Sequence, residues 1–259
     1  ERYQQLTPAS IRRGCVLPIL RAAPVAALDK LFPFPAYLGN AGKQRFLSFL
    51  EGYSARDLGQ NYVALRSLYD PSQRRDLYAA DYREQASEDW IHRADTTDAR
   101  PLERLLNLQY HDWLQDFALL RQDKLSMAHG LEVRLPFLDN TLIDFASRLP
   151  ARCKLRGRRN KVLLRRLASR RLPAEIARRK KQAFYFPLES FAQDPKFLDL
   201  VEHTLNPASV AARGIFDGNA IQTLRRQALS GEFLVLKQMM ALVMLELWMK
   251  MFIDGETLF

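Results

Sequence analysis

The chain has 259 residues, of which 47% are hydrophobic and 10% aromatic. This composition supplies enough apolar sequence for a buried core, so it excludes intrinsic disorder and collagen-like repetition. Lys and Arg outnumber Asp and Glu by 39 to 29, and this excess predicts a basic globular protein with an anionic partner.

Cysteine and histidine are too sparse to form a disulfide framework or a metal knuckle. The chain has two cysteines, Cys15 and Cys153, and four histidines that lie far apart. We therefore expect no metal site. Free cysteines fit a reducing compartment, so the predicted location is cytoplasmic.

The first third of the chain predicts short helices joined by loops. Residues 1–75 alternate short apolar runs, at 11–20, 45–50 and 62–68, with Pro and Gly. Asp70 before Pro71 predicts a turn or a helix start. The polar residues 87–100 predict a loop that leads into a helix near Pro101.

Three helices are predicted after Pro101. The first carries apolar residues three and four positions apart, a pattern that we assign to core packing: Leu106, Tyr110, Trp113, Phe117 and Leu120. The second follows Asp139 and ends at Pro150, and the third spans 161–171 and ends at Leu172-Pro173.

The most apolar run, 233–253, predicts a helix buried in a core. It contains Lys237, Glu246 and Lys250, so its uncharged stretch is too short for a membrane span. There is no internal repeat and no strand alternation longer than four residues. The predicted fold class is therefore mostly α.

The positive charge is concentrated in residues 152–181, which contain fourteen Lys or Arg and one acid, Glu175. The rest of the chain has 25 basic and 28 acidic residues, so the whole excess lies in this segment. Crowded like charges repel, and an anion compensates them. The segment has no aromatic residue for stacking on single-stranded nucleic acid, which favours a phosphate-bearing small molecule. A polyanion- or nucleic-acid-binding module remains the alternative.

Four sequence blocks in order resemble the glutamine-hydrolysing asparagine synthetases. Residues 126–139 (SMAHGLEVRLPFLD) are similar to the family signature SMAHSLEVRVPFLD, and 154–166 are similar to its KLRG and K-LLR block. Residues 172–188 resemble LP, RRKKQGFG and PL, and 245–248 (LELW) resemble the family's terminal helix. The resemblance covers residues 105–252, whereas residues 1–100 match only loosely.

The resemblance implies the C-terminal helical portion of an α/β adenine-nucleotide α-hydrolase-like (ATP-pyrophosphatase) synthetase domain. Residues 1–100 would form a helical and loop segment, and 101–259 the signature-bearing helical core. The family's glutaminase and its Ser-Gly-Gly-x-Asp-Ser loop have no counterpart in the sequence, and residues 39–43 do not match that loop. Residue 1 is Glu and the first Met is Met127, so we expect a piece of a longer protein that is inactive alone.

The implied activity is a carbon–nitrogen ligase reaction that takes ATP and Mg²⁺, bound mainly by the missing N-terminal part. A carboxylate, with aspartate as the first candidate, is adenylated and then aminated by glutamine-derived ammonia. A sugar acid of polysaccharide synthesis is an alternative acceptor, because Ala183 and Tyr185 replace family glycines. A membrane and nucleic acid are not expected as partners, and homodimerisation of the full-length protein is left open.

Lys161 matches the family lysine that stabilises charge on the phosphates, so it is the predicted catalytic residue. Weaker candidates for substrate or pyrophosphate binding are Arg121, Asp123, Arg134 and Lys180. Glu132 and Arg134, which neighbour the apolar Leu131 and Val133, could instead form a structural ion pair. We also expect exposed apolar surface on the helices that carry Trp113 and Trp248.

Overall fold

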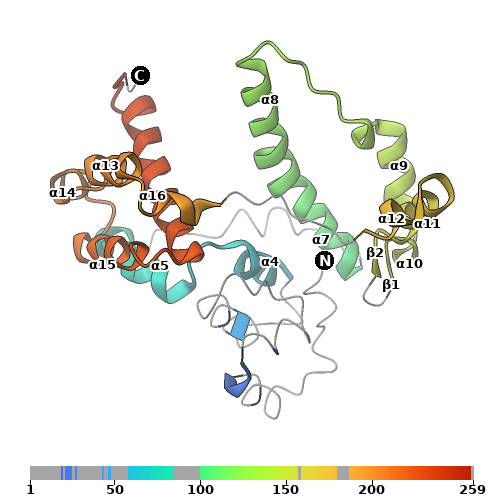
Figure 1. Cartoon of the computed structure of the whole chain (residues 1–259), viewed down its shortest axis with the longest axis horizontal. Coiled ribbons are helices and arrows are strands. Elements are labelled where there is room, and N and C mark those ends of the chain that lie inside the picture. Colours follow the sequence, from blue (N-terminus) through green and yellow to red (C-terminus); the bar gives the residue numbers. More distant parts are fainter. Residues whose placement is uncertain are drawn as a thin grey trace. The chain divides into compact units, whose positions relative to one another are not determined.

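The computed structural model describes residues 19, 21–24, 27, 43, 46–47, 58–83, 100–156, 159–179 and 187–257, and most of them are helical (Figure 1). The prediction of a mostly α protein is confirmed. The predicted apolar runs at 11–20 and 45–50 and the loop 87–99 lie largely or wholly outside the described residues.

The chain divides into two compact units, each built from separate segments. The first contains Glu1–Arg12, Ser54–Tyr62 and Asp89–Ala183, and the second contains Arg13–Tyr53, Val63–Glu88 and Phe184–Phe259. Helix α4 (Leu58–Arg66) begins in the first unit and ends in the second.

The first unit begins with a continuous helical segment. It comprises α7 (Pro101–Leu108), the π-helical η4 (Gln109–Leu119) and α8 (Leu120–Met127). Pro101 occupies the first turn of α7, as predicted, because its missing N–H needs no partner there. Leu58 and Tyr62 of α4 pack with two buried leucines of α7, and the Tyr62 hydroxyl donates to Asp112 at 2.6 Å.

The apolar face of this helical segment is exposed, so its assignment to the core was wrong. Tyr110, Trp113, Phe117 and Leu120 are 41–52% exposed, whereas Leu105 and Leu108 form the buried contact. Helical periodicity shows which residues share a face but does not supply an element that covers that face. The separate expectation of exposed apolar surface at Trp113 and Trp248 is confirmed, because these side chains are 42% and 49% exposed.

The rest of the first unit consists of short elements after the signature segment. These are η5 (Pro136–Leu138), α9 (Asn140–Arg148), α10 (Ala151–Lys154), β1 (Leu155–Arg156), β2 (Arg159–Asn160), α11 (Val162–Arg171) and α12 (Ala174–Ala177). The Asp139 carboxylate caps α9 by accepting from the Leu142 N–H at 3.1 Å. The predicted helices at 142–149 and 161–171 are therefore confirmed to within one or two residues.

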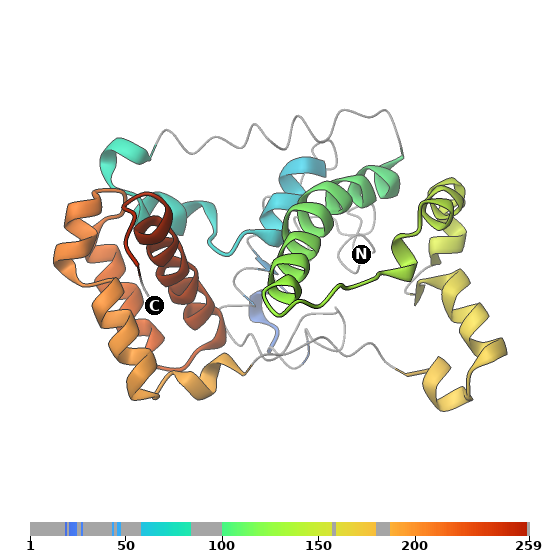
Figure 2. The same cartoon turned by 90° about the horizontal axis from the view of Figure 1, so that it is seen from above.

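The second unit packs around α16 (Phe233–Phe252). Helices α13 (Pro195–Thr204) and α15 (Gly218–Ala228) and the short η6 (Leu188–Phe191) contact it, as Figures 1 and 2 show. Helix α14 (Pro207–Arg213) and α5 (Pro71–Leu77) pack on α15, and η3 (Ala80–Tyr82) follows α5. Leu236 and Val243 of α16 are almost fully buried, which confirms the predicted core helix. No described helix is long and apolar enough to cross a membrane.

Polar contacts join α16 to the segment before α5. The Tyr69 hydroxyl donates to the Gln238 carbonyl at 2.7 Å, and the Gln238 amide donates to the Leu68 carbonyl at 2.9 Å. Burial raises the pKa of Tyr69, since the ionised phenol would lose its hydration. Asp70 then caps α5 in a reciprocal capping box with Gln73, which makes the predicted helix start correct.

Arg213, at the end of α14, joins two carboxylates of the C-terminal region. It donates to Glu246 at 2.8 and 3.1 Å and to Asp254 at 2.6 and 3.1 Å. The Glu246 side chain is only 8% exposed, so its charge depends on this bidentate partner. The contact fixes the end of α16 and the following residues against α14.

Replacing Arg213 by Met should lower the free energy of unfolding by about 3 kcal/mol, because the buried Glu246 carboxylate would lose its partner. Urea titration followed by circular dichroism measures this change. Arg226→Met is the matched control, since Arg226 is exposed and reaches only the Thr223 hydroxyl at 3.3 Å. Equal effects of the two substitutions would contradict a structural role for the Arg213 cluster.

The stability that Asp254 contributes should depend on pH. Hydrogen bonds from Arg213 hold the pKa of Asp254 below its usual range. The folded-state pKa is thus lower than the unfolded value of about 3.9, so the carboxylate stabilises the fold above that pH and ceases to do so as pH falls through the folded value. The difference in Tm between the parent and Asp254→Asn should be constant from about pH 5 to 7 and shrink below about pH 4. A difference that grows on acidification would contradict the assignment.

The exposed aromatic face of η4 should bind the uncharged dye Nile red in native buffer, because adjacent apolar side chains there lie open to solvent. Replacing Trp113 and Phe117 by Gln should reduce the dye fluorescence. Tyr82→Gln is the control, because Tyr82 is exposed but lies outside this face. A parent chain that gives no fluorescence above that of a fully packed protein would show that the face is covered.

Candidate functional site

Lys161 lies between a β-hairpin and a helix in an unusual backbone conformation. It follows β2 directly and is the N-cap residue of α11, with φ 51° and ψ 42°. Among the described residues it is the one non-glycine residue with positive φ. This left-handed conformation costs a residue with a Cβ about 1–2 kcal/mol, so the surrounding structure must hold it.

The start of α11 is electrostatically suited to an anion. The Lys161 side chain makes no capping hydrogen bond, and the first turn contains no acidic residue. The free N–H groups and the helix dipole give this end a partial positive charge. The exposed Lys161 ammonium, which has no hydrogen bond or ion pair with a described residue, adds a full charge.

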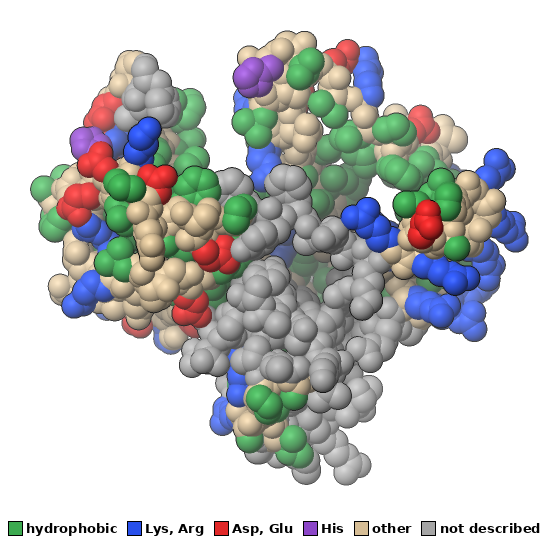
Figure 3. Space-filling model, in the orientation of Figure 1, with side chains coloured by type: hydrophobic (Ala, Val, Ile, Leu, Met, Phe, Trp, Pro, Cys, Tyr) green, Lys and Arg blue, Asp and Glu red, His purple; other side chains and the backbone are tan. Residues whose placement is uncertain are grey.

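A basic surface surrounds this position. The described part of residues 152–179 contains eleven Lys or Arg and one acid, Glu175, and most of the cations are exposed. Figure 3 shows Lys and Arg side chains gathered over α10–α12. The Lys154 ammonium donates to the Ser147 carbonyl at 3.0 Å, which ties the start of the hairpin to α9. No ion pair between described residues includes a Lys or Arg of residues 152–178.

The weaker predicted site residues lie on other elements. Arg121 of α8 stacks over the Phe117 ring at 4.6 Å, and Asp123, two residues further along, is exposed. Arg134 pairs with Glu132 at 2.6 Å, not with Asp123. Lys180 lies outside the described residues. No hydrogen bond or ion pair between described residues joins Lys161 to any of these candidates.

The signature segment is an exposed connection between α8 and α9. Gly130, with φ 65°, turns the chain after α8, and its N–H donates to the Met127 carbonyl at 3.0 Å. The apolar side chains of Leu131 and Val133 are 63% and 41% exposed. The Glu132–Arg134 ion pair exists but is largely exposed, and it contributes little stability there.

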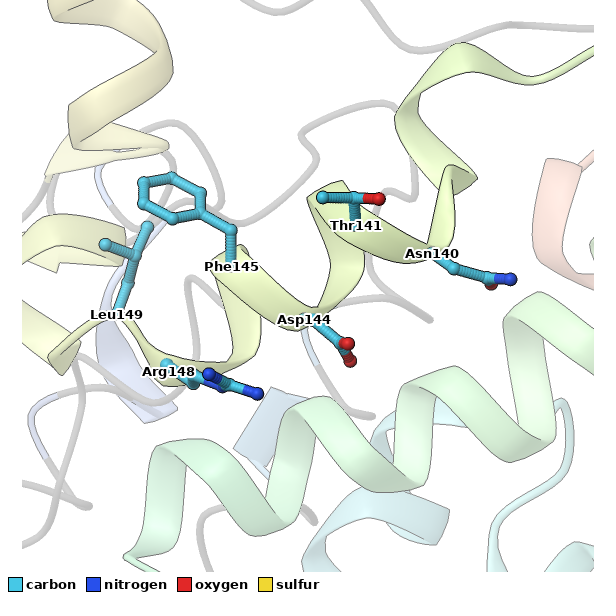
Figure 4. Close-up of a pocket in the computed structure, with 6 residues that line it drawn as sticks. All are labelled: Asn140, Thr141, Asp144, Phe145, Arg148 and Leu149. Atoms are coloured by element: carbon cyan, nitrogen blue, oxygen red, sulfur yellow. The ribbon is translucent and has the colours of Figure 1, made fainter.

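A pocket of about 630 Å³ over α9 was missed in the sequence analysis. Its described lining residues come from α9 and the residue that follows it: Asn140, Thr141, Asp144, Phe145, Arg148 and Leu149. Figure 4 shows Asn140, Asp144 and Arg148 in one row and Thr141, Phe145 and Leu149 in a second. Asn140, Asp144 and Arg148 are four residues apart in the sequence, and this spacing could have predicted that they share one face of a helix. The pocket contains none of the predicted site residues.

No three described His, Cys, Asp or Glu side chains lie close enough together to hold a metal ion. The described residues therefore offer no cluster of three such ligands for the Mg²⁺ that the resemblance implies.

Comparison with known proteins identifies the family. The Asparagine synthase family model matches residues 28–250. A glutamine-hydrolysing asparagine synthetase of Bacillus subtilis is 33% identical over 93 residues, which are 36% of this chain and 15% of that protein. One from Gallus gallus is 38% identical over 100 residues, 37% of this chain and 17% of that protein. A Mycobacterium tuberculosis protein, named provisionally as the same enzyme, is 27% identical over 176 residues, 65% of this chain and 27% of its own length.

The family match extends over most of the chain and includes the signature segment, the hairpin, Lys161 and most of α16. The chain belongs to the asparagine synthase family. It spans between 15% and 27% of the length of these relatives. No solved structure matches it.

Proposed function

We propose that this chain forms part of an ATP-dependent amidotransferase and supplies the cations that face the phosphates. The observation that carries the proposal is Lys161, an exposed lysine in a left-handed conformation at a helix start with no side-chain cap, within a basic surface. The family membership supports the same assignment. We further propose that the chain is the C-terminal helical portion of an ATP-pyrophosphatase-type synthetase domain.

The proposed reaction has two steps. A carboxylate oxygen, with aspartate as the first candidate, attacks the α-phosphorus of ATP, and pyrophosphate leaves. Ammonia then attacks the carbonyl carbon of the acyl-AMP, and AMP leaves as the amide forms. Negative charge develops on the leaving pyrophosphate in the first step, so a cation positioned there lowers the barrier.

Lysine suits this role because its compact ammonium, on a flexible stem, can follow charge as it moves to the leaving group. The backbone of Lys161 is fixed by the hairpin before it and by α11 after it, since the Arg165 N–H donates to the Lys161 carbonyl at 2.9 Å. Arg121, Asp123, Arg134 and Lys180 stay proposals for weaker substrate or pyrophosphate contacts.

The test reads the coding DNA upstream of the Glu1 codon and expresses the longest continuous reading frame that contains this chain. AMP release with ATP, Mg²⁺, ammonia and aspartate is then measured, with a sugar acid and a β-amino acid as other acceptors. Activity with aspartate supports asparagine synthesis. Activity with another acid alone would overturn the choice of aspartate, and a frame that lacks a Ser-Gly-Gly-x-Asp-Ser loop would overturn the proposal.

In that longer protein, Lys161→Gln should lower the rate of AMP release by roughly 10²- to 10³-fold. The lysine ammonium stabilises the negative charge that develops on the phosphates in the transition state more than it stabilises the bound substrates. Arg170→Gln, on the same helix, is the matched control and should change the rate less than about threefold. The 259-residue chain alone should release no AMP. Full activity from it, or equal effects of the two substitutions, would contradict the role of Lys161.

A further inference from the structure

Two arginines face each other across the hairpin that precedes Lys161. In the antiparallel register of β1 and β2, Arg156 pairs with Arg159 and Leu155 pairs with Asn160. Residues directly opposite in such a pair have Cβ atoms about 5 Å apart on the same face of the hairpin. Both arginines are exposed.

The two positive charges destabilise the hairpin when no anion is bound between them. Like charges directly opposite each other destabilise a strand pair, and each of these strands has only two residues. No described carboxylate forms an ion pair with either arginine. The contact between Lys154 and Ser147 holds the start of the hairpin, and the β1–β2 pairing keeps the two arginines on directly opposite backbone positions.

We propose that Arg156 and Arg159 form a clamp that binds one phosphate group of a small molecule between their guanidinium groups. Each guanidinium presents a planar set of donors that matches two phosphate oxygens, and charge-assisted hydrogen bonds of this kind are strong. The surrounding positive charge attracts the anion to the surface.

Identification of the bound group with the pyrophosphate of ATP rests on the proposed function, whereas the clamp itself does not.

The observations favour a small molecule over nucleic acid. The described part of residues 152–179 has no aromatic side chain on which a base could stack. Two guanidinium groups on directly opposite residues converge on one phosphate, whereas a nucleic-acid backbone presents phosphates spaced along its length.

The test is isothermal titration calorimetry of the 259-residue chain with inorganic pyrophosphate at physiological salt. Arg156→Gln/Arg159→Gln should weaken binding roughly 10- to 100-fold, since two charge-assisted contacts are lost. Arg170→Gln/Arg171→Gln removes the same charge from the end of α11 and should weaken it less than about threefold. Arg156→Lys/Arg159→Lys keeps the charge but loses the planar donors, so its affinity should fall between these two.

Thermal unfolding gives a second signature that a merely structural role would not produce. Without ligand, Arg156→Gln/Arg159→Gln should unfold at the same temperature as the parent or higher, because the cross-strand repulsion is relieved. Pyrophosphate should raise the Tm of the parent more than that of the variant, because the variant binds it more weakly. A variant that unfolds at a clearly lower temperature without ligand would overturn the clamp.

Equal loss of pyrophosphate affinity in both double Gln variants would show diffuse attraction by the basic surface and overturn the clamp. Tighter binding of a 20-base-pair DNA duplex than of pyrophosphate, weakened equally in both, would assign the surface to nucleic acid. Absence of pyrophosphate binding by the parent would also overturn the clamp, while AMP release by the longer protein would leave the proposed function standing.

Discussion

Repulsion among the cations of residues 152–179 is the constraint that most shapes the first unit. The whole positive excess of the chain lies in and just after this stretch, and no described ion pair includes a Lys or Arg of residues 152–178. Short elements hold it together through hydrogen bonds to backbone groups: the Asp139 cap of α9, the Lys154–Ser147 hydrogen bond and the two-residue strands. A surface that folds against its own charge gains stability from any anion that binds the folded form.

In the second unit, by contrast, buried and half-buried charges form ion pairs. Arg213 is shared between Glu246 and Asp254, and Arg225 pairs with Glu202. These pairs surround a core built on α16, whose apolar side chains fill the space between α13 and α15. Packed, neutralised regions give a rigid frame, whereas exposed and unneutralised surfaces are where ligands bind. The contrast therefore supports our proposal that the phosphate-binding residues lie in the first unit.

The sequence was a good guide wherever the signal was local. Asp70, Pro101 and Asp139 start helices because each satisfies or avoids the free N–H groups of a first turn, and this chemistry is complete within four residues. It was a poor guide wherever a second element decides the outcome. Trp113 and Leu131 have core-like patterns but lie exposed, and the Arg213–Glu246 pair spans 33 residues that carry no spacing rule. The pairing of Arg156 with Arg159 depends on a register that no apolar pattern in two-residue strands could set.

The left-handed conformation of Lys161 is another feature that the sequence alone could not predict. A sequence selected for folding alone would place Gly or Asn at a left-handed position, because either avoids much of the steric cost that a lysine Cβ carries. The hairpin and α11 nevertheless impose that conformation on a lysine, and the resulting strain is not offset by any described contact of its side chain. Backbone strain of this kind clusters at ligand-binding sites, so an interaction between the Lys161 side chain and a ligand would explain it. The left-handed lysine and the facing arginines are thus two independent features of one short segment, and the phosphate that we propose to bind there would give both a partner of opposite charge.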